Sequence, residues 1–219
     1  MLYLVSTPIG NLGDITFRAT DILRSVDFVL AEDTRQTGKL MQRYEIKTRL
    51  VSFHEHASDD KINWVIGQLQ EGRDIALVSD AGTPNLSDPG GKLVEEALKS
   101  GISVSPIPGP SALTALIATA PFSCSQFTFL GYFPKKKGRQ TMIKTIKDSE
   151  HPVFFYESPH RIIKTLNFLK DNLEEFDILL GRELTKKFEE IRFFDLKSQK
   201  DIDTMREQGE FVFSLVRKR

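Results

Sequence analysis

Two kinds of apolar segment alternate along the first half of the chain. Short apolar runs with the length of buried strands occur at Leu2 to Val5, Phe28 to Ala31 and Ile75 to Val78. Amphipathic segments with helical spacing of their apolar positions lie between these runs, from Phe17 to Val26 and from Asp59 to Gln70. This alternation predicts an α/β domain that is built on a parallel sheet.

The remaining segments predict a second α/β domain, which is richer in strands and is expected to carry a mixed sheet. The other strands are expected at Leu50 to Phe53, Ile102 to Ser105, Phe127 to Gly131, Val153 to Tyr156, Phe176 to Leu180, Glu190 to Leu196 and Phe211 to Val216. The other helices are expected from Glu32 to near Tyr44 and at Leu93 to Lys99, Ser111 to Thr119, Met142 to Asp148, His160 to Asn172 and Ser198 to Gln208. The short stretch from Pro121 to Ser125 is the expected junction, which gives domains at residues 1–120 and 121–219.

Three loops rich in glycine and proline follow strands of the first domain. They are TPIGNLGDIT from Thr7, SDAGTPNLSDPGG from Ser79 and PIPGPSA from Pro106. In open α/β sheets, ligands bind beyond the carboxyl ends of the strands, where such loops gather. Glycine lets the backbone turn sharply and approach a ligand closely, although a turn without a ligand needs the same residues.

Composition limits the classes of protein to which the chain can belong. It is 40% hydrophobic and 27% charged, as in ordinary globular proteins, and no apolar run is long enough to span a membrane. Cys124 is the only cysteine, so no intrachain disulfide is possible, and no secretory signal is evident. We therefore expect a cytoplasmic protein. The sequence lacks the Walker, G-x-G-x-x-G and G-x-S-x-G patterns, which argues against P-loop hydrolases, Rossmann dinucleotide-binding proteins and serine hydrolases.

The formal net charge is zero, but the charges are unevenly distributed. Residues 1–118 hold 11 basic and 15 acidic residues, whereas residues 119–219 hold 19 and 15. The excess cations of the second half include Lys135, Lys136, Lys137 and Arg139, with further clusters at Lys186 to Lys187 and Arg217 to Arg219. These clusters are either solvated surface or a surface that faces phosphates.

Several polar motifs lie at the ends of expected elements. Glu32 to Arg35, EDTR, opens a helix. The helix dipole favours acidic residues at this end of a helix, which explains Glu32 and Asp33, and Arg35 is a candidate phosphate ligand. His54 to His56, HEH, lacks an obvious third metal ligand, so we expect no metal site. In YESPHR, Ser158 or Pro159 is a candidate helix start.

The three loops, together with EDTR, HEH, FFYESPHR and RELTK, make the chain resemble the tetrapyrrole methylase superfamily. Within it, the resemblance is to the group that methylates ribosomal RNA of the small subunit, and it extends from Leu2 to about Val216. The resemblance implies two α/β domains with S-adenosylmethionine held in the crevice between them, and a homodimer. The cofactor-binding residues it implies are Pro8, Gly10, Ala81, Gly82, Thr83, Leu86, Ser111, Ala112, Glu157 and Leu184.

The resembled group methylates the ribose 2′-hydroxyl of a cytidine in the decoding region of 16S rRNA, in the small ribosomal subunit. A hydroxyl is a poor nucleophile, so a nearby base or a cation that favours its alkoxide should assist the transfer. The candidates for this catalytic role are Arg35, Glu157, His160, Arg161 and Lys186, and the sequence does not single out one of them. A helix-capping role explains Ser158 to Arg161 equally well.

Some positions depart from the pattern of the resembled group. Gln36 stands where a histidine is expected, and Ala57 replaces an asparagine. Many members also continue into a small helical domain after the last strand, whereas this sequence ends at Arg219. Two alternatives stay open, a methylase of a small tetrapyrrole and a non-catalytic protein that binds RNA or senses the cofactor. The basic KKKGR stretch and the YESPHR and RELTK motifs favour the RNA methyltransferase.

Overall fold

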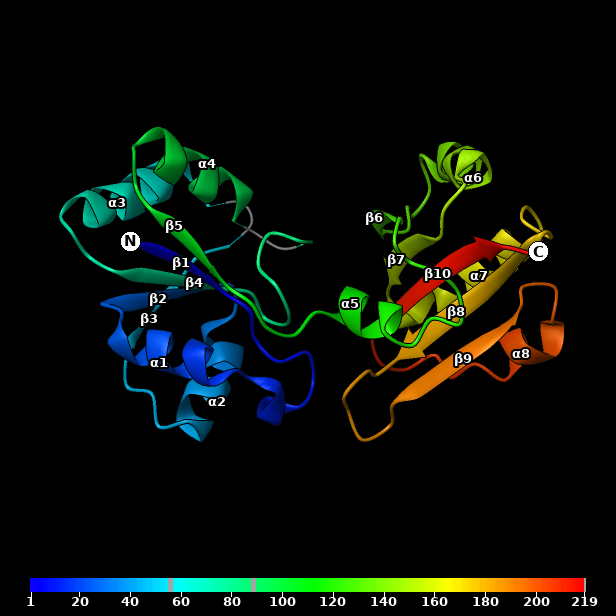
Figure 1. Cartoon of the computed structure of the whole chain (residues 1–219), viewed down its shortest axis with the longest axis horizontal. Coiled ribbons are helices and arrows are strands. Elements are labelled where there is room, and N and C mark those ends of the chain that lie inside the picture. The colour runs from blue at the N-terminus through cyan, green and yellow to red at the C-terminus, as the bar shows by residue number, and fades with distance from the viewer. Residues whose placement is uncertain (55–56, 88–89, 219) are drawn as a thin grey trace. The chain divides into compact units, whose positions relative to one another are not determined.

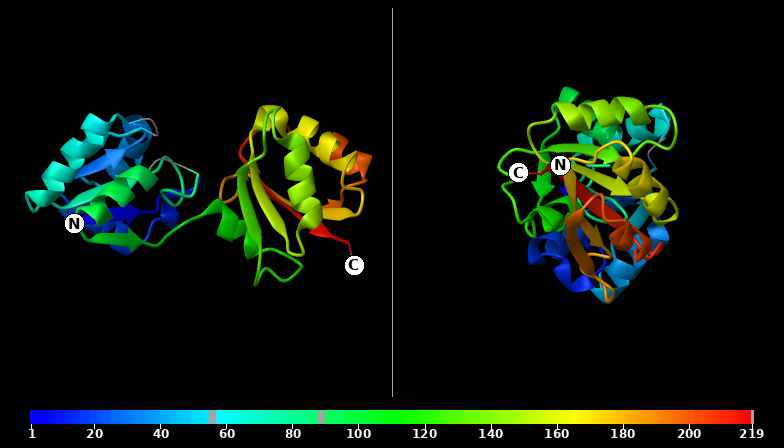
Figure 2. Two further views of the ribbon diagram at one scale, coloured as in Figure 1. Left: turned by 90° about the horizontal axis from the view of Figure 1, so that it is seen from above. Right: turned by 90° about the vertical axis from the view of Figure 1, so that its right-hand side faces the viewer.

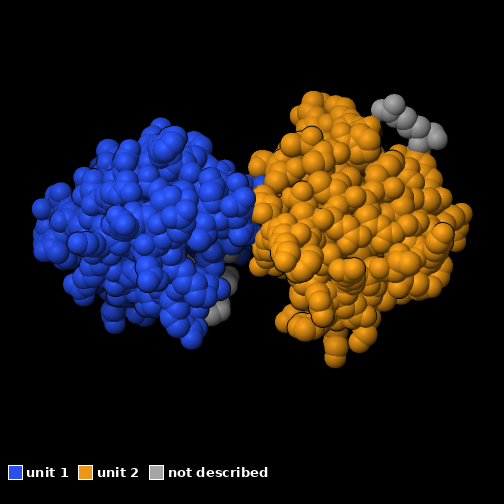
Figure 3. Space-filling model, turned by 90° about the horizontal axis from the view of Figure 1, so that it is seen from below, with its two compact units in different colours: residues 1–111 blue, residues 112–219 orange. Residues whose placement is uncertain are grey.

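The computed structural model describes residues 1–54, 57–87 and 90–218. The chain forms two compact units, Met1–Ser111 and Ala112–Arg219, which are coloured separately in Figure 3. Each unit contains its own sheet with five strands. The described residues include no helix of the length and apolar character required to cross a membrane.

The first unit is built on a fully parallel sheet, as predicted. Its strand order is β3-β2-β4-β1-β5. Residues of β2 and β4 are buried on both faces, which explains their continuous apolar sequences. The strands are β1 (Leu2–Val5), β2 (Phe28–Ala31), β3 (Arg49–Ser52), β4 (Ile75–Val78) and β5 (Val104–Ile107).

Helices cover both faces of this sheet and give three layers, which Figure 1 shows clearly. Helices α3 (Asp59–Gln70) and α4 (Gly91–Lys99) pack on one face, and α1 (Phe17–Ser25) and α2 (Thr34–Arg43) pack on the other. A short 3-10 helix, η1 (Leu12–Asp14), precedes α1. Thr16 caps the start of α1, because its hydroxyl accepts a hydrogen bond from the Ala19 amide at 3.1 Å.

The second unit contains the predicted mixed sheet, in the order β6-β7-β10-β8-β9. Strands β6 and β7 are parallel, and the other neighbouring strands are antiparallel. The strands are β6 (Thr128–Tyr132), β7 (Val153–Glu157), β8 (Phe176–Arg182), β9 (Glu190–Asp195) and β10 (Phe211–Arg217). The helical segments are α5 (Ala112–Ile117), α6 (Arg139–Asp148), η2 (Pro159–Arg161), α7 (Ile162–Lys170) and α8 (Gln199–Asp203).

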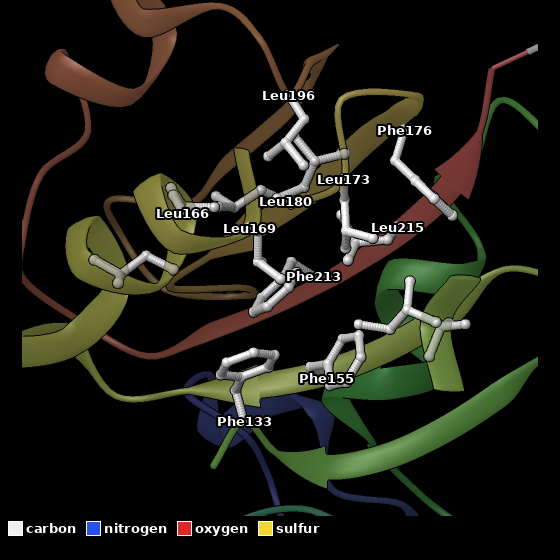
Figure 4. Close-up of a cluster of buried hydrophobic side chains, with 14 of the residues drawn as sticks. Phe133, Phe155, Leu166, Leu169, Leu173, Phe176, Leu180, Leu196, Phe213 and Leu215 are labelled. Atoms are coloured by element: carbon white, nitrogen blue, oxygen red, sulfur yellow. The ribbon is translucent and has the colours of Figure 1, made fainter. Parts of the chain in front are cut away.

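An aromatic and aliphatic core lies between this second sheet and its helices. Figure 4 shows Phe155 and Phe213 side by side in this core, with ring centroids 5.3 Å apart. Phe133 meets Phe155 edge-on at 5.7 Å, and Leu166 of α7 completes the same cluster. The left view of Figure 2 shows helices of this unit lying along one face of the sheet. The segment before Glu157 and the start of α7 are therefore firmly packed.

Several predicted boundaries are corrected by the structure. Strand β5 begins at Val104 rather than Ile102, because it pairs with β1 from Leu2 opposite Val104. Pro106 fits within it because β5 is an edge strand, where a missing amide donor is tolerated. Helix α8 spans only Gln199–Asp203 of the predicted 198–208, and α6 begins at Arg139 rather than Met142. The helix predicted from His160 is preceded by η2, which Pro159 opens, and α7 itself begins at Ile162.

The boundary between the compact units lies at Ser111, earlier than the predicted limit of 120. Helix α5 contacts β10 and therefore packs within the second unit. A Cβ placed on Gly181 of β8 would lie 3.0 Å from Cδ1 of Leu116 in α5, which shows how closely the helix covers this sheet. The apolar face of α5 thus determines to which unit it belongs.

Candidate active site

In open α/β sheets, ligands bind beyond the carboxyl ends of two adjacent strands whose following loops run to opposite faces of the sheet. In the first unit, the adjacent strands β1 and β4 meet this description. The chain leaves β1 for α1 on one face of the sheet, and it leaves β4 for α4 on the opposite face. Loops that diverge in this way form the topological switch point of an open α/β sheet. The first two loops singled out in the sequence are the loops at this point.

Short hydrogen bonds join these two loops. The backbone of Thr7 pairs with that of Gly82, with N–O distances of 2.9 and 3.0 Å. The Thr7 hydroxyl donates to the carbonyl oxygen of Ser79 at 3.1 Å, and the hydroxyls of Ser6 and Thr83 are 3.1 Å apart. Ser6, Thr7 and Ser79 are all buried, so the bonds lie beneath the loop surface. The loops therefore hold each other in a fixed conformation.

The third loop lies against the other two. The Thr83 hydroxyl is 3.3 Å from the carbonyl oxygen of Pro110 and donates to it. A Cβ placed on Gly109 would lie only 2.9 Å from Cβ of Ser6, so a larger residue at 109 would displace the first loop. The structure thus brings together the three loops that the sequence places far apart.

Gly82 occupies a position that favours glycine. Its φ is +82°, and an added Cβ would lie 3.4 Å from Cγ2 of Ile9 and 3.8 Å from the carbonyl oxygen of Pro110. Around it, Pro8 is buried, whereas Gly10, Ala81 and Leu86 are exposed. Small residues, backbone polar groups and buried hydroxyls suit a nucleoside-like ligand with few charges. The cradle therefore fits S-adenosylmethionine, which needs close backbone approach more than cationic side chains.

The other implied cofactor residues lie in the second loop, at the end of the third loop and in the second unit. Thr83 is half-buried and hydrogen-bonded as described, and Ser111 is buried at the end of the first unit. Ala112 begins α5, Glu157 ends β7, and Leu184 follows β8. Their roles toward the cofactor stay predictions.

Glu157 is fully buried, and its carboxylate is engaged within the second unit. Oε1 accepts a hydrogen bond from the Ser158 amide at 2.7 Å and forms an ion pair with Arg161. Oε2 accepts a hydrogen bond from the Thr165 hydroxyl at 2.7 Å. Arg161 also donates from Nε to the Ser158 hydroxyl at 3.1 Å. These bonds fix the turn after β7, so we interpret Glu157 as a residue that positions this turn.

Arg139 extends this network from α6. Its Nη2 donates to the Thr165 hydroxyl at 3.3 Å, and its guanidinium lies over the rings of Phe168 and Phe133 at 4.3 and 5.3 Å. Its Nε is buried and has no hydrogen-bond partner among the described atoms. The cation–π attraction of two aromatic rings offsets the cost of removing part of this guanidinium from water. The sequence grouped Arg139 with the three preceding lysines as a phosphate ligand, and the structure instead directs it inward.

His160 and Arg161 differ in their surroundings although they are neighbours. His160 is exposed in the 3-10 turn η2, whereas the Arg161 side chain is 23% exposed and paired with Glu157. Ser158 is the N-cap residue of η2, but its side chain makes no capping hydrogen bond. The simple capping explanation of this motif is therefore incomplete, because the motif is held chiefly by Glu157.

The RELTK motif forms a constrained turn around Leu184. Glu183 and Thr185 have φ values of +52° and +68°. This conformation is uncommon for any residue except glycine, and it is rare for a β-branched residue such as Thr185. Leu184 is buried, and an added Cβ on Gly181 would lie 3.0 Å from its Cδ2. Strained backbone of this kind concentrates at functional sites. The turn is therefore a candidate ligand contact in the second unit.

Lys186 is held in its charged form. Its Nζ lies 2.9 Å from Oε1 of Glu183 and 3.1 Å from Oε2 of Glu210. Burial lowers the pKa of Lys186, but the hydrogen bonds to both carboxylates outweigh it and raise the pKa above its ordinary value. A permanently protonated ammonium cannot accept a proton, so Lys186 does not fit the role of general base.

Arg35 is committed to its own neighbour. Its Nε and Nη2 donate to the two carboxylate oxygens of Asp33 at 3.0 and 2.8 Å. These hydrogen bonds lower the pKa of Asp33 to about 2. Asp33 also caps α2 through the Arg35 amide, as the helix-dipole explanation expects, and its own amide donates to Asp80 at 2.9 Å. The motif therefore ties the end of β2 to the loop after β4.

No group of three or more candidate metal ligands occurs within residues 1–54, 57–87 and 90–218. Nε2 of His54 is 2.7 Å from the Ser52 hydroxyl. The rest of the HEH motif, Glu55 and His56, lies outside the described residues, as do Asp88 and Pro89 of the second loop.

The sequence interpretation missed the buried polar residues that support these motifs. Ser6, Thr7 and Ser79 directly follow apolar strands, and this placement was a signal that polar side chains would lie beneath the loops. Thr165 in α7 carried no such signal, since its partners Arg139 and Glu157 belong to other elements, 26 and 8 positions away.

Curated relatives match most of this chain. Ribosomal RNA small subunit methyltransferase I of Thermotoga maritima is 45% identical over 86% of this chain and 85% of its own length. The protein of the same name from Leptospira biflexa is 41% identical over 98% of this chain and 90% of its own length. That of Bacillus subtilis is 48% identical over 87% of this chain but only 65% of its own length.

Solved structures share the fold at low sequence identity. Diphthine synthase aligns with a TM-score of 0.77 and 14% identity over 98% of this chain and 89% of its own. The methyltransferase CobJ aligns with a TM-score of 0.71 and 18% identity over 100% of this chain and 95% of its own. The family model described as Tetrapyrrole (Corrin/Porphyrin) Methylases matches residues 1–198. The chain therefore belongs to the tetrapyrrole methylase family.

Proposed function

We propose that this chain is an S-adenosylmethionine-dependent methyltransferase that methylates the ribose 2′-hydroxyl of a cytidine in the decoding region of 16S rRNA. The observation that carries the RNA substrate is the 41–48% identity, over most of the chain, to proteins named ribosomal RNA small subunit methyltransferase I. Structural neighbours with 14–18% identity support the fold alone.

The joined loops of the first unit are proposed to hold the cofactor. Pro8, Gly10, Ala81 to Thr83, Leu86 and Ser111 belong to these loops. When bound, S-adenosylmethionine supplies a methyl group on a positively charged sulfur. The loops contribute a fixed backbone with close approach at Gly82, and their mutual hydrogen bonds keep that conformation before the ligand arrives. Ala112, Glu157 and Leu184 remain members of this set through the family resemblance.

His160 is the best candidate to accept the proton of the ribose hydroxyl. Glu157 is buried and bonded on both oxygens, Lys186 is held as a cation, and Arg35 is paired with Asp33. His160 is exposed, and histidine is the side chain that most often serves as a general base in enzymes. Arg161, fixed by Glu157, is proposed to favour the alkoxide as a neighbouring cation.

The RNA strand is proposed to bind at Lys135, Lys136 and Lys137. All three are exposed, and the described residues provide no ion-pair partner for them. The other basic clusters are largely neutralised, since Lys186 pairs with two glutamates and Lys218 pairs with Asp195. Phosphate contacts of this kind position a strand without identifying its sequence.

Nucleoside mass analysis of 16S rRNA tests the proposed reaction. A strain that lacks the protein should lose one 2′-O-methylcytidine, and the parental gene should restore it. His160→Ala should fail to restore it although cofactor affinity, measured by calorimetry, stays near the parental value. Unchanged ribose methylation in the deletion strain would contradict the proposed function, and full restoration by His160→Ala would contradict only the assignment of the base.

The same family resemblance leads us to propose a homodimer that acts on the assembled small subunit. Sedimentation over a range of concentrations measures the assembly state, and a persistent monomer of about 24.9 kDa would contradict it. Methyl incorporation into the folded subunit should exceed that into a short oligonucleotide, because RNA recognition depends on shape.

A further inference from the structure

Strand β6 contains a bulge just before the lysine-rich segment. Phe129 pairs with Phe154 and Tyr132 pairs with Tyr156, so three steps along β6 correspond to two steps along β7. The extra residue is accommodated near Gly131, whose φ is +65°. Apart from the neighbouring residues in the chain, no described atom lies within 4 Å of the position of an added Cβ there, so the backbone conformation, and not lack of space, favours glycine.

The bulge changes the face on which Tyr132 lies. Residues three apart in a regular strand point to opposite faces of the sheet. Here both Phe129 and Tyr132 contact the ring of Tyr156, with centroids 5.0 and 5.5 Å apart and interplanar angles of 67° and 62°. Tyr132 nevertheless remains 58% exposed. The bulge thus presents a supported aromatic ring to solvent.

This ring lies at the start of the segment that carries the three exposed lysines. Figure 1 shows the chain passing from β6 towards α6, and Lys135, Lys136 and Lys137 belong to this connection. The segment is anchored by Phe133, which is 1% exposed, and by the stacked guanidinium of Arg139. Tyr132 and the lysines are consequently held together on one short segment.

We propose that Tyr132 is a stacking platform for an unpaired base of the RNA strand whose phosphates bind Lys135 to Lys137. An exposed aromatic ring beside a run of cations is the combination that single-stranded nucleic acid recognises, since every base has a face that can stack. A protein partner fits less well, because lysine is depleted at protein interfaces. The inference rests on the proposed RNA substrate and adds a base contact to it.

Binding of single-stranded oligoribonucleotides tests this platform. One probe carries the fluorescent base 2-aminopurine within a cytidine-containing strand, and a second probe has the same backbone with abasic positions. Tyr132→Ala, Tyr132→Leu and Tyr132→Phe are compared with the parent, and circular dichroism verifies that each variant is folded. Phe188→Ala is the matched control, because Phe188 is equally exposed at 58% in the same unit but lies outside this segment.

The parent should bind the base-containing probe more tightly than the abasic probe and should quench 2-aminopurine. Tyr132→Ala and Tyr132→Leu should lose about 5-fold or more in affinity for the base-containing probe only, with the salt dependence unchanged. Tyr132→Phe and Phe188→Ala should match the parent. If Tyr132→Ala and the parent showed the same ratio of affinities for the base-containing and abasic probes, the stacking contact would be overturned and the proposed function would stand. A parent that binds neither probe nor the small subunit would overturn both.

Discussion

The buried carboxylate of Glu157 gives the sharpest test of how the second unit is organised. The perturbation is Glu157→Gln, which preserves the shape of the side chain but removes its charge. If Glu157 positions the turn after β7, as its contacts indicate, the substitution should act first on stability. If it instead takes part directly in methyl transfer, activity should fall without a loss of stability.

The magnitude follows from the three hydrogen bonds to the carboxylate. They come from the Ser158 amide, the Thr165 hydroxyl and Arg161. Hydrogen bonds to a charged group contribute about 1.5–3 kcal/mol each, and neutral ones about 0.5–1.5 kcal/mol. The Thr165 hydroxyl can reverse its direction to accept from the new amide, so all three bonds can survive. Those with Ser158 and Thr165 become neutral, and that with Arg161 keeps only the charge of the guanidinium. The expected destabilisation is therefore about 1 kcal/mol per bond, or about 3 kcal/mol in total.

Thermal and urea unfolding of Glu157→Gln and the parent measure this loss. A change of about 3 kcal/mol in a unit of this size should lower the melting temperature by on the order of 10 °C. Arg161→Met leaves the carboxylate buried without its cation and should destabilise the protein by a similar or larger amount. The double variant should cost clearly less than the sum, since the two residues form one ion pair.

The result that would refute this reasoning is specific. Parental stability of Glu157→Gln, combined with lost methyl transfer and retained cofactor affinity, would show that the carboxylate acts on the substrate directly. Strict additivity of Glu157→Gln and Arg161→Met would show that the ion pair contributes nothing to the turn. The first outcome would return Glu157 to the set of catalytic residues, and the second would leave the turn to be held by the Ser158 and Thr165 hydrogen bonds.

Three further predictions address the loops, the charged turn and the basic segment. Gly82→Val should abolish most cofactor affinity in calorimetry, whereas Gly72→Val, which has a similar φ of +87° in open space, should alter stability alone. Burial raises the pKa of Glu183, but the hydrogen bonds from Lys186 and from the Glu210 amide outweigh burial and lower this pKa below its ordinary value of 4.5. The contribution of Glu183 to the unfolding free energy is therefore present above pH 4.5 and declines as the pH falls. Glu183→Gln should flatten that acid decline in the unfolding free energy, and an unchanged slope would refute the pairing with Lys186. Replacing Lys135 to Lys137 by alanine should reduce the salt dependence of RNA binding by roughly 0.7 in log–log slope per lost contact, whereas Arg139→Met should lower stability and leave that slope unchanged.

Local patterns in the sequence determined most of the secondary structure and the family. Strand β4 and helix α3 have the predicted limits, because burial on both faces and helical periodicity are properties of a short segment. The Gly/Pro loops were recognisable for the same reason, since their turn residues directly follow apolar strands. The motifs then sufficed to predict the family.

Only the tertiary structure decided which charges face inward and which elements pack together. Arg139 resembles its lysine neighbours in sequence, but its partner Thr165 lies 26 positions away and its aromatic partners lie in β6–α6 and α7. Helix α5 belongs to the second unit because of its contact with β10, and the exposed ring of Tyr132 depends on a register shift against β7. Such features depend on which distant segments meet, because a side chain's charge or periodicity does not specify its partner.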